Sequence, residues 1–190
     1  MINNQYTQSV NDAIKQVTEI KALKDEWSLI KKGKYYSLSS RKYKDCQNKL
    51  LKVEGTLPTA ILLLVNSILA TLILHSLKIE HFAQLAAMAN SLPKEMLTVR
   101  HRKCISNNEI LLVNGVLDEH QKLPRKQDVI RTEHAIYALY LTKLSANTTN
   151  FELYFQKDPS TSFSEQIFTK LSDVVLNSYE KDVETLMAKK

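Results

Sequence analysis

Glycine and proline are scarce in this chain, which has three glycines and four prolines among 190 residues. Average usage would give about 13 glycines and about 9 prolines in a chain of this length. A β-sandwich or β-barrel needs a turn about every 8–12 residues and draws heavily on glycine and proline to make it. The deficit therefore argues against those folds and favours an all-helical chain.

The three glycines, Gly33, Gly55 and Gly115, are also too far apart to build a phosphate-binding loop. Loops of the G-x-G-x-x-G or G-x-x-x-x-G-K-[ST] kind need their glycines within a few positions of one another. The sequence has no G-x-S-x-G nucleophile elbow and no H-E-x-x-H pair, and its histidines and cysteines lack the spacing of zinc ligands. We therefore expect no catalytic residue, no metal and no cofactor, and so a protein that is not an enzyme.

The two cysteines, Cys46 and Cys104, show no C-x-x-C spacing. Such cysteines are typical of free thiols in a reducing compartment. The first residues lack the basic region followed by an apolar region that is typical of a secretory signal peptide. Both observations favour a cytoplasmic protein.

Apolar residues between positions 9 and 30 recur at intervals of three and four, the spacing of one helical face. Similar reasoning predicts further helices over 37–54, 57–77, 79–90, 128–146 and 164–187. The stretch 94–127 is irregular, with a short helix or strand near Ile110–Val113 and a turn at residues 114–115. The expected fold class is thus all-α, a compact bundle of about five to seven helices. We expect residues 1–150 to form the bundle, with the irregular stretch as an insertion, and residues 151–190 to form a C-terminal helical extension.

Residues 57–77 are almost entirely apolar and approach the length of about 20 residues that spans a bilayer. Polar side chains interrupt the run at Asn66, Ser67, Thr71, His75 and Ser76. A helix that is apolar nearly all round is usually buried on most sides. We therefore expect a central core helix here, and membrane association only as a third, weaker hypothesis.

Positive charge is concentrated between residues 31 and 52, which carry a net charge of +7 in a protein whose total is +6. Three tyrosines are interleaved with the basic residues. Lysine and arginine neutralise phosphates, and tyrosine stacks on unpaired bases, so the segment suits RNA. The alternative is a solvated helical face with its tyrosines in the core. The basic candidates for RNA binding in this segment are Lys31, Lys32, Lys34, Arg41, Lys42, Lys44, Lys49 and Lys52.

Two stretches of the sequence resemble the small helical subunit of type III-B (Cmr) CRISPR RNA-guided effector complexes. Residues 57–58 read Leu-Pro and residues 66–72 read Asn-Ser-Ile-Leu-Ala-Thr-Leu, near that family's Pro-containing turn and following helix. Residues 131–135 read Arg-Thr-Glu-His-Ala, and residues 140–146 read Tyr-Leu-Thr-Lys-Leu-Ser-Ala, near its later helix. The sequence departs from the pattern at Ser67, where the family has glycine, and at Tyr140, where it has tryptophan.

The resemblance implies a non-catalytic subunit in antiviral defence. It would stack with copies of itself along the guide–target duplex, beside other effector-complex subunits, and touch target-RNA phosphates. The resemblance adds Arg131 and Lys143 to the candidate RNA-binding residues. The alternative is an all-helical protein-interaction subunit of another complex, without direct nucleic-acid contact. Neither hypothesis involves a membrane.

Overall fold

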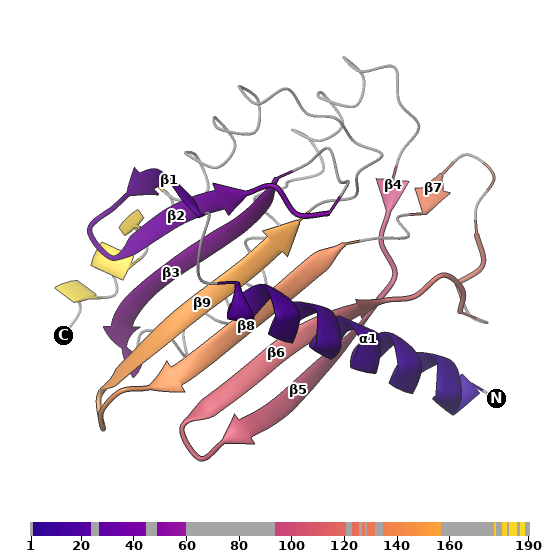
Figure 1. Cartoon of the computed structure of the whole chain (residues 1–190), viewed down its shortest axis with the longest axis horizontal. Coiled ribbons are helices and arrows are strands. Elements are labelled where there is room, and N and C mark those ends of the chain that lie inside the picture. Colours follow the sequence, from indigo (N-terminus) through magenta and orange to yellow (C-terminus); the bar gives the residue numbers. More distant parts are fainter. Residues whose placement is uncertain are drawn as a thin grey trace.

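The main feature of the computed structural model is an antiparallel sheet of seven strands in the order β1-β2-β3-β9-β8-β6-β5 (Figure 1). Two short strands, β4 and β7, form a separate parallel pair. The structure describes residues 2–23, 27–44, 49–59, 94–120, 123–125, 127, 129–131, 135–156, 177, 180–181, 183–185 and 187–188. The elements are α1 (Ile2–Ala22), β1 (Ser28–Lys32), β2 (Tyr36–Arg41), β3 (Leu50–Pro58), β4 (Lys94–Glu95), β5 (Thr98–Ser106), β6 (Glu109–Val116), β7 (Ile130–Arg131), β8 (Ile136–Lys143) and β9 (Thr148–Gln156).

The expectation of an all-α bundle is therefore wrong. The predicted helix over 37–54 is replaced by β2 and β3, and the one over 128–146 by β7 and β8. The supposed irregular insertion over 94–127 contains β5 and β6, and β9 runs across position 150 without a break. Three expectations agree with the structure: α1 covers much of the first predicted helix, a strand is present near Ile110–Val113 as part of β6, and the described residues between 177 and 188 are helical. The turn expected at residues 114–115 is wrong, because β6 continues through them to Val116.

Asparagine and serine make the tight turns that the scarcity of glycine seemed to exclude. Residues 107–108 form the turn between β5 and β6, and the Ser106 hydroxyl accepts a hydrogen bond from the Asn108 N–H at 3.2 Å. In the β8–β9 turn the Ser145 hydroxyl accepts the Asn147 N–H, also at 3.2 Å. Such side chains stabilise turns by bonding to nearby backbone groups. A low glycine content therefore does not exclude antiparallel hairpins.

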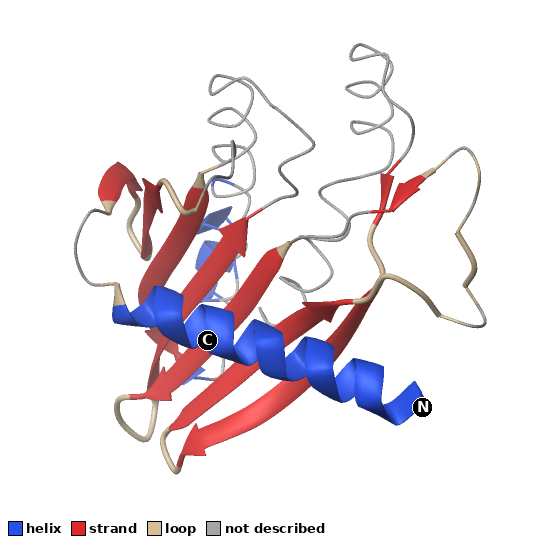
Figure 2. Ribbon diagram, turned by 45° about the vertical axis from the view of Figure 1, so that its right-hand side comes forward, coloured by secondary structure: helices blue, strands red, loops and turns tan. Residues whose placement is uncertain are grey.

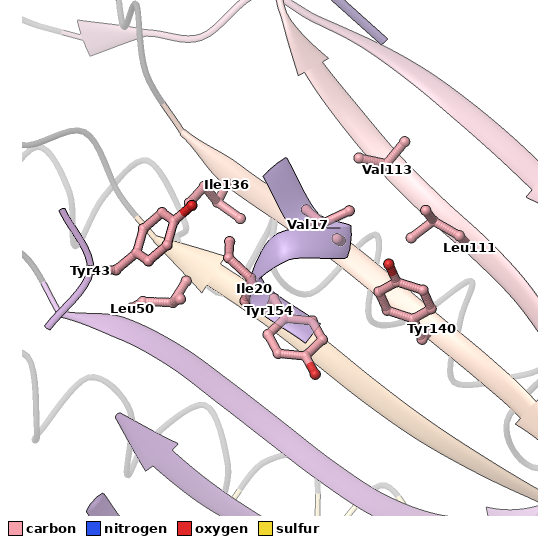
Figure 3. Packing of buried hydrophobic residues seen from close by; sticks show 10 residues of the cluster. Val17, Ile20, Tyr43, Leu50, Leu111, Val113, Ile136, Tyr140 and Tyr154 are labelled. Carbon is pink, nitrogen blue, oxygen red and sulfur yellow. The ribbon is translucent and has the colours of Figure 1, made fainter. Parts of the chain in front are cut away.

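Both faces of the sheet are apolar, and each is covered by a different part of the chain. Helix α1 crosses one face, mainly over β6 and less closely over β5 and β8, and we call this the α1 face (Figures 1 and 2). Val17 and Ile20 of α1 pack there on Leu50, Leu111 and strand residues around them (Figure 3). The opposite face, which we call the inner face, carries a second buried cluster: Tyr36, Leu38, Leu51, Leu57, Leu139, Phe151, Leu153 and Val183 of the C-terminal segment.

Candidate functional site

The inner face of the sheet carries continuous rows of apolar side chains. Residues paired across antiparallel strands point to the same side of a sheet, so the strand register defines each row. One row runs from β5 to β2 through Arg102, Leu112, Leu139, Leu153, Val53 and Leu38. The next runs through Cys104, Ile110, Leu141, Phe151, Gly55 and Tyr36. These two rows, together with Tyr137, Phe155 and Leu51 of the row beside the first, form an apolar band across six strands.

Several apolar side chains of this band are only half-buried. Leu139 and Leu153 are 5% and 6% exposed, whereas their row neighbours Val53 and Leu112 are of intermediate exposure. Leu141 and Phe155 are half-buried in the same way and pack on the inner cluster. An apolar side chain that the fold leaves partly uncovered gains free energy when a ligand covers it. The band is therefore suited to an apolar ligand.

The C-terminal segment lies against the β1–β2 end of the inner face. Val183 is completely buried in the inner cluster. The Lys34 N–H donates to the Glu180 carboxylate at 2.6 Å, and the Lys31 ammonium donates to Asn177 at 2.8 Å. A β-carbon at Gly33 would overlap the Glu180 carboxylate, so glycine permits this close approach. The sheet and the C-terminal segment together enclose one end of the apolar band.

The α1 face, by contrast, is closed by α1 and neutralised by ion pairs. Lys21 of α1 pairs with Glu109 and, at 3.7 Å, with Glu152, and its ammonium lies 3.9 Å from the centre of the Tyr140 ring. The Tyr154 hydroxyl donates to Glu152 at 2.7 Å. Burial, and then this carboxylate, raise the pKa of Tyr154, which keeps the phenol neutral. These contacts are typical of a helix–sheet interface rather than of a ligand site.

Tyr137 is a polar side chain on the inner face. It lies on β8 opposite Phe155 of β9. Burial raises the pKa of Tyr137, and the positive charge of Arg100 acts against that rise. The phenol is therefore a neutral hydrogen-bonding group within electrostatic reach of a guanidinium.

The eight basic residues between 31 and 52 do not share a helical face. They are divided among β1, β2, β3 and the turns between them. Lys34 pairs with Glu184 at 3.1 Å, Lys52 pairs with Glu54 at 3.0 Å, and Arg41 stacks 5.6 Å from the Trp27 ring. Exposed positions are held by Lys32, Lys42, Lys44 and Lys49. The predicted basic helix is thus wrong, and phosphate contact by these side chains stays a prediction.

Arg131 and Lys143, the two remaining candidates, lie in opposite environments. Lys143 is exposed at the end of β8. The Arg131 side chain is 2% exposed, and its guanidinium pairs with Glu95 of β4 at 2.6 Å. It also donates to the carbonyl oxygens of Asp118 at 2.9 Å and Leu123 at 3.0 Å. The Arg131 guanidinium thus links β7 to β4 and to the backbone at Asp118 and Leu123.

The inner face was missed by the sequence analysis, although part of its signal is visible in the sequence. Residues 151–155 read Phe-Glu-Leu-Tyr-Phe, so large apolar side chains recur at every second position. That period of two is the mark of a strand with one apolar face. Nothing in the sequence shows which strands pair, so the rows themselves become visible only in the structure.

The described residues contain neither a membrane-spanning helix nor a cluster of metal ligands. Within the ranges that the structure describes, no helix is long and apolar enough to cross a bilayer. The apolar helices predicted over 57–77 and 79–90 lie outside the described residues, apart from positions 57–59. The described residues likewise bring together no group of three potential metal ligands.

Comparison with known proteins identifies the fold but no family. No protein-family model matches the sequence, and no curated protein does. The structure is similar to human StAR-related lipid transfer protein 5, with a TM-score of 0.63 and 11% identity over 96% of this chain and 96% of that chain. It is also similar to human STARD10, with a TM-score of 0.50 and 14% identity over 87% of this chain and 75% of that chain.

These likenesses overturn the resemblance to the Cmr subunit. They give no support to an effector complex, to RNA or stacked copies of the chain as partners, or to an all-helical interaction subunit. The chain has the fold of StAR-related lipid transfer domains, a curved antiparallel sheet with helices against it.

Proposed function

We propose that this protein binds a single lipid between the inner face of the sheet and the C-terminal segment, and carries it between membranes. The observation that supports this proposal is the apolar band, whose half-buried side chains lie on the same face of the sheet as Val183 of the C-terminal segment. The likeness to a lipid transfer protein over 96% of both chains also supports the proposal. Binding and release suffice for this activity, so the protein needs no catalytic residue. A carrier acts in the aqueous space between membranes, and a cytoplasmic location is part of the proposal.

The free energy available from an acyl chain is large enough for stable binding. Each methylene that leaves water contributes about 0.8 kcal/mol, so ten of them contribute roughly 8 kcal/mol before the cost of association. The strands that carry the band are hydrogen-bonded on both sides, except at the sheet edges. Their side chains are therefore held in place before the lipid arrives, which lowers the cost of ordering the site.

Filling the band with a larger side chain is expected to reduce lipid transfer. Leu141 is half-buried on the inner face, so Leu141→Trp places an indole in the space that we assign to the lipid. We expect the initial rate of transfer of a fluorescent phospholipid between donor and acceptor vesicles to fall about tenfold, the equivalent of about 1.4 kcal/mol of lost binding.

The matched control is Leu144→Trp, three residues along the chain, where the side chain is 58% exposed. This variant should transfer at the wild-type rate. Thermal unfolding of both variants separates a filled site from a disrupted fold. Equal transfer rates for Leu141→Trp and the wild type, with both proteins folded, would remove the inner face from the proposal.

A further inference from the structure

Charge is sorted between the two faces of the sheet. The glutamates Glu54, Glu109 and Glu152 all point to the α1 face, where Lys21 and Lys52 neutralise them. By strand register, none of the described strands of the seven-stranded sheet places a carboxylate on the inner face. The charged groups that these strands do place there are basic.

Two of these basic residues form a rim at the β5 edge of the apolar band. Arg102 begins the row that continues through Leu112, and Arg100 lies opposite Asn114 in the neighbouring row. Both arginines are exposed, and the Arg100 side chain donates to Asn114 at 3.2 Å. At the other end of the Arg102 row, Lys31 is already bonded to Asn177 of the C-terminal segment. The basic rim at β5 is thus the end that the described part of the C-terminal segment does not contact.

We propose that the lipid carries an acidic head group, and that Arg100 and Arg102 hold this group at the β5 rim while the apolar tail lies along the band. The inference rests on the proposed lipid-binding function and names the class of lipid. A guanidinium presents donors in a planar fork that fits a carboxylate or a phosphate. At an exposed rim, this pairing does not require either charge to be taken fully out of water, so little of its energy is lost to desolvation.

Tyr137 provides a second polar contact on the same side. Its phenol lies within electrostatic reach of Arg100 and is kept protonated by burial, which raises its pKa. A protonated phenol can donate a hydrogen bond to an anionic oxygen. An acidic head group at the rim would therefore meet two guanidinium groups and one neutral donor.

The test compares lipids that differ only in the head group. Oleate and oleyl alcohol have the same tail, and their affinities are measured by displacement of a bound fluorescent lipid below micelle-forming concentrations. We expect the wild type to bind oleate at least about tenfold more tightly, which corresponds to one charge-assisted hydrogen bond. The double variant Arg100→Gln/Arg102→Gln should lose this preference and keep its affinity for oleyl alcohol.

Lys103→Gln is the matched control for the arginine variant. Lys103 lies between the two arginines on β5 but pairs with Leu111, so it points to the α1 face. This substitution removes one positive charge from the same strand and should leave the preference for oleate unchanged. If Lys103→Gln lost the preference for oleate to the same extent, the overall charge of the strand would explain the effect, and the proposal would be overturned.

A second pair of lipids identifies the source of the acidic group. Vesicles of dioleoyl phosphatidylcholine containing dioleoyl phosphatidate are compared with vesicles of phosphatidylcholine alone as the lipid source. Arginine-dependent preference for oleate or for phosphatidate supports the inference and assigns a carboxylate or a phosphate. Binding of neutral and acidic lipids with equal affinity overturns the inference and leaves the proposed function in place. Failure to bind any of the four lipids contradicts the proposed function itself.

Discussion

Arg131→Met is expected to lower the free energy of unfolding by about 3 kcal/mol or more, as measured by urea denaturation. Removal of one partner from a buried ion pair costs about 3–5 kcal/mol, because the remaining charge stays buried without an opposite charge beside it. In this protein the guanidinium bonds to Glu95 and to the carbonyl oxygens of Asp118 and Leu123, so all three lose a donor. The Glu95 side chain is 31% exposed, so water can hydrate its carboxylate in the variant. The expected cost is therefore at the lower end of this range.

Lys143→Met is the control for this prediction. Both residues are basic, and both were candidates for RNA binding, but Lys143 is exposed. Replacement of an exposed side chain usually changes stability by no more than about 0.5 kcal/mol. If the two variants were equally stable, Arg131 would not be the structural anchor that its contacts indicate.

Val183→Asp is the second substitution with a large expected effect. Val183 is completely buried and joins the C-terminal segment to the inner cluster around Tyr36 and Leu38. The change removes a buried apolar side chain and places a carboxyl group among apolar ones, with an expected cost of about 3 kcal/mol or more. Because the C-terminal segment is part of the proposed site, lipid affinity should fall together with stability.

Thr185→Asp is the control for the negative charge that Val183→Asp adds. Thr185 is two residues along the chain and exposed. This variant should unfold at the same urea concentration as the wild type and bind lipid with the same affinity. A Val183→Asp protein with unchanged stability and affinity would show that the C-terminal segment does not cover the inner face.

Helix α1 was predictable from the sequence because its apolar residues face only one side. Val10, Val17 and Ile20 are buried, and the residues between them are mostly exposed, which gives the periodicity of an amphipathic helix. Strand β8 was not predictable in this way, because it is covered on both faces. Ala138, Leu139 and Tyr140 are all buried in succession, and a short apolar run has no period that separates a strand from a buried helix.

The candidate site depends on pairings between distant parts of the chain, which explains why sequence patterns did not reveal it. Arg131 is a basic residue in the sequence, and its burial depends on Glu95, which is 36 positions away. Arg102 and Leu153 share one row only because four strands pair in a particular order and register. The concentration of positive charge between residues 31 and 52 is visible directly in the sequence. Its division among three strands and the turns between them is a property of the fold.

The most direct test of lipid binding on the inner face is photolabelling of the wild-type protein with a fatty acid that carries a diazirine in its tail. After irradiation, peptide mass spectrometry locates the labelled residues. Labels on the band, at Leu112, Leu141 and Phe155, with competition by unlabelled oleate, are the result that we expect. Labels confined to the α1 face, at Val17 and Tyr154, or labels that unlabelled oleate does not reduce, would contradict binding on the inner face.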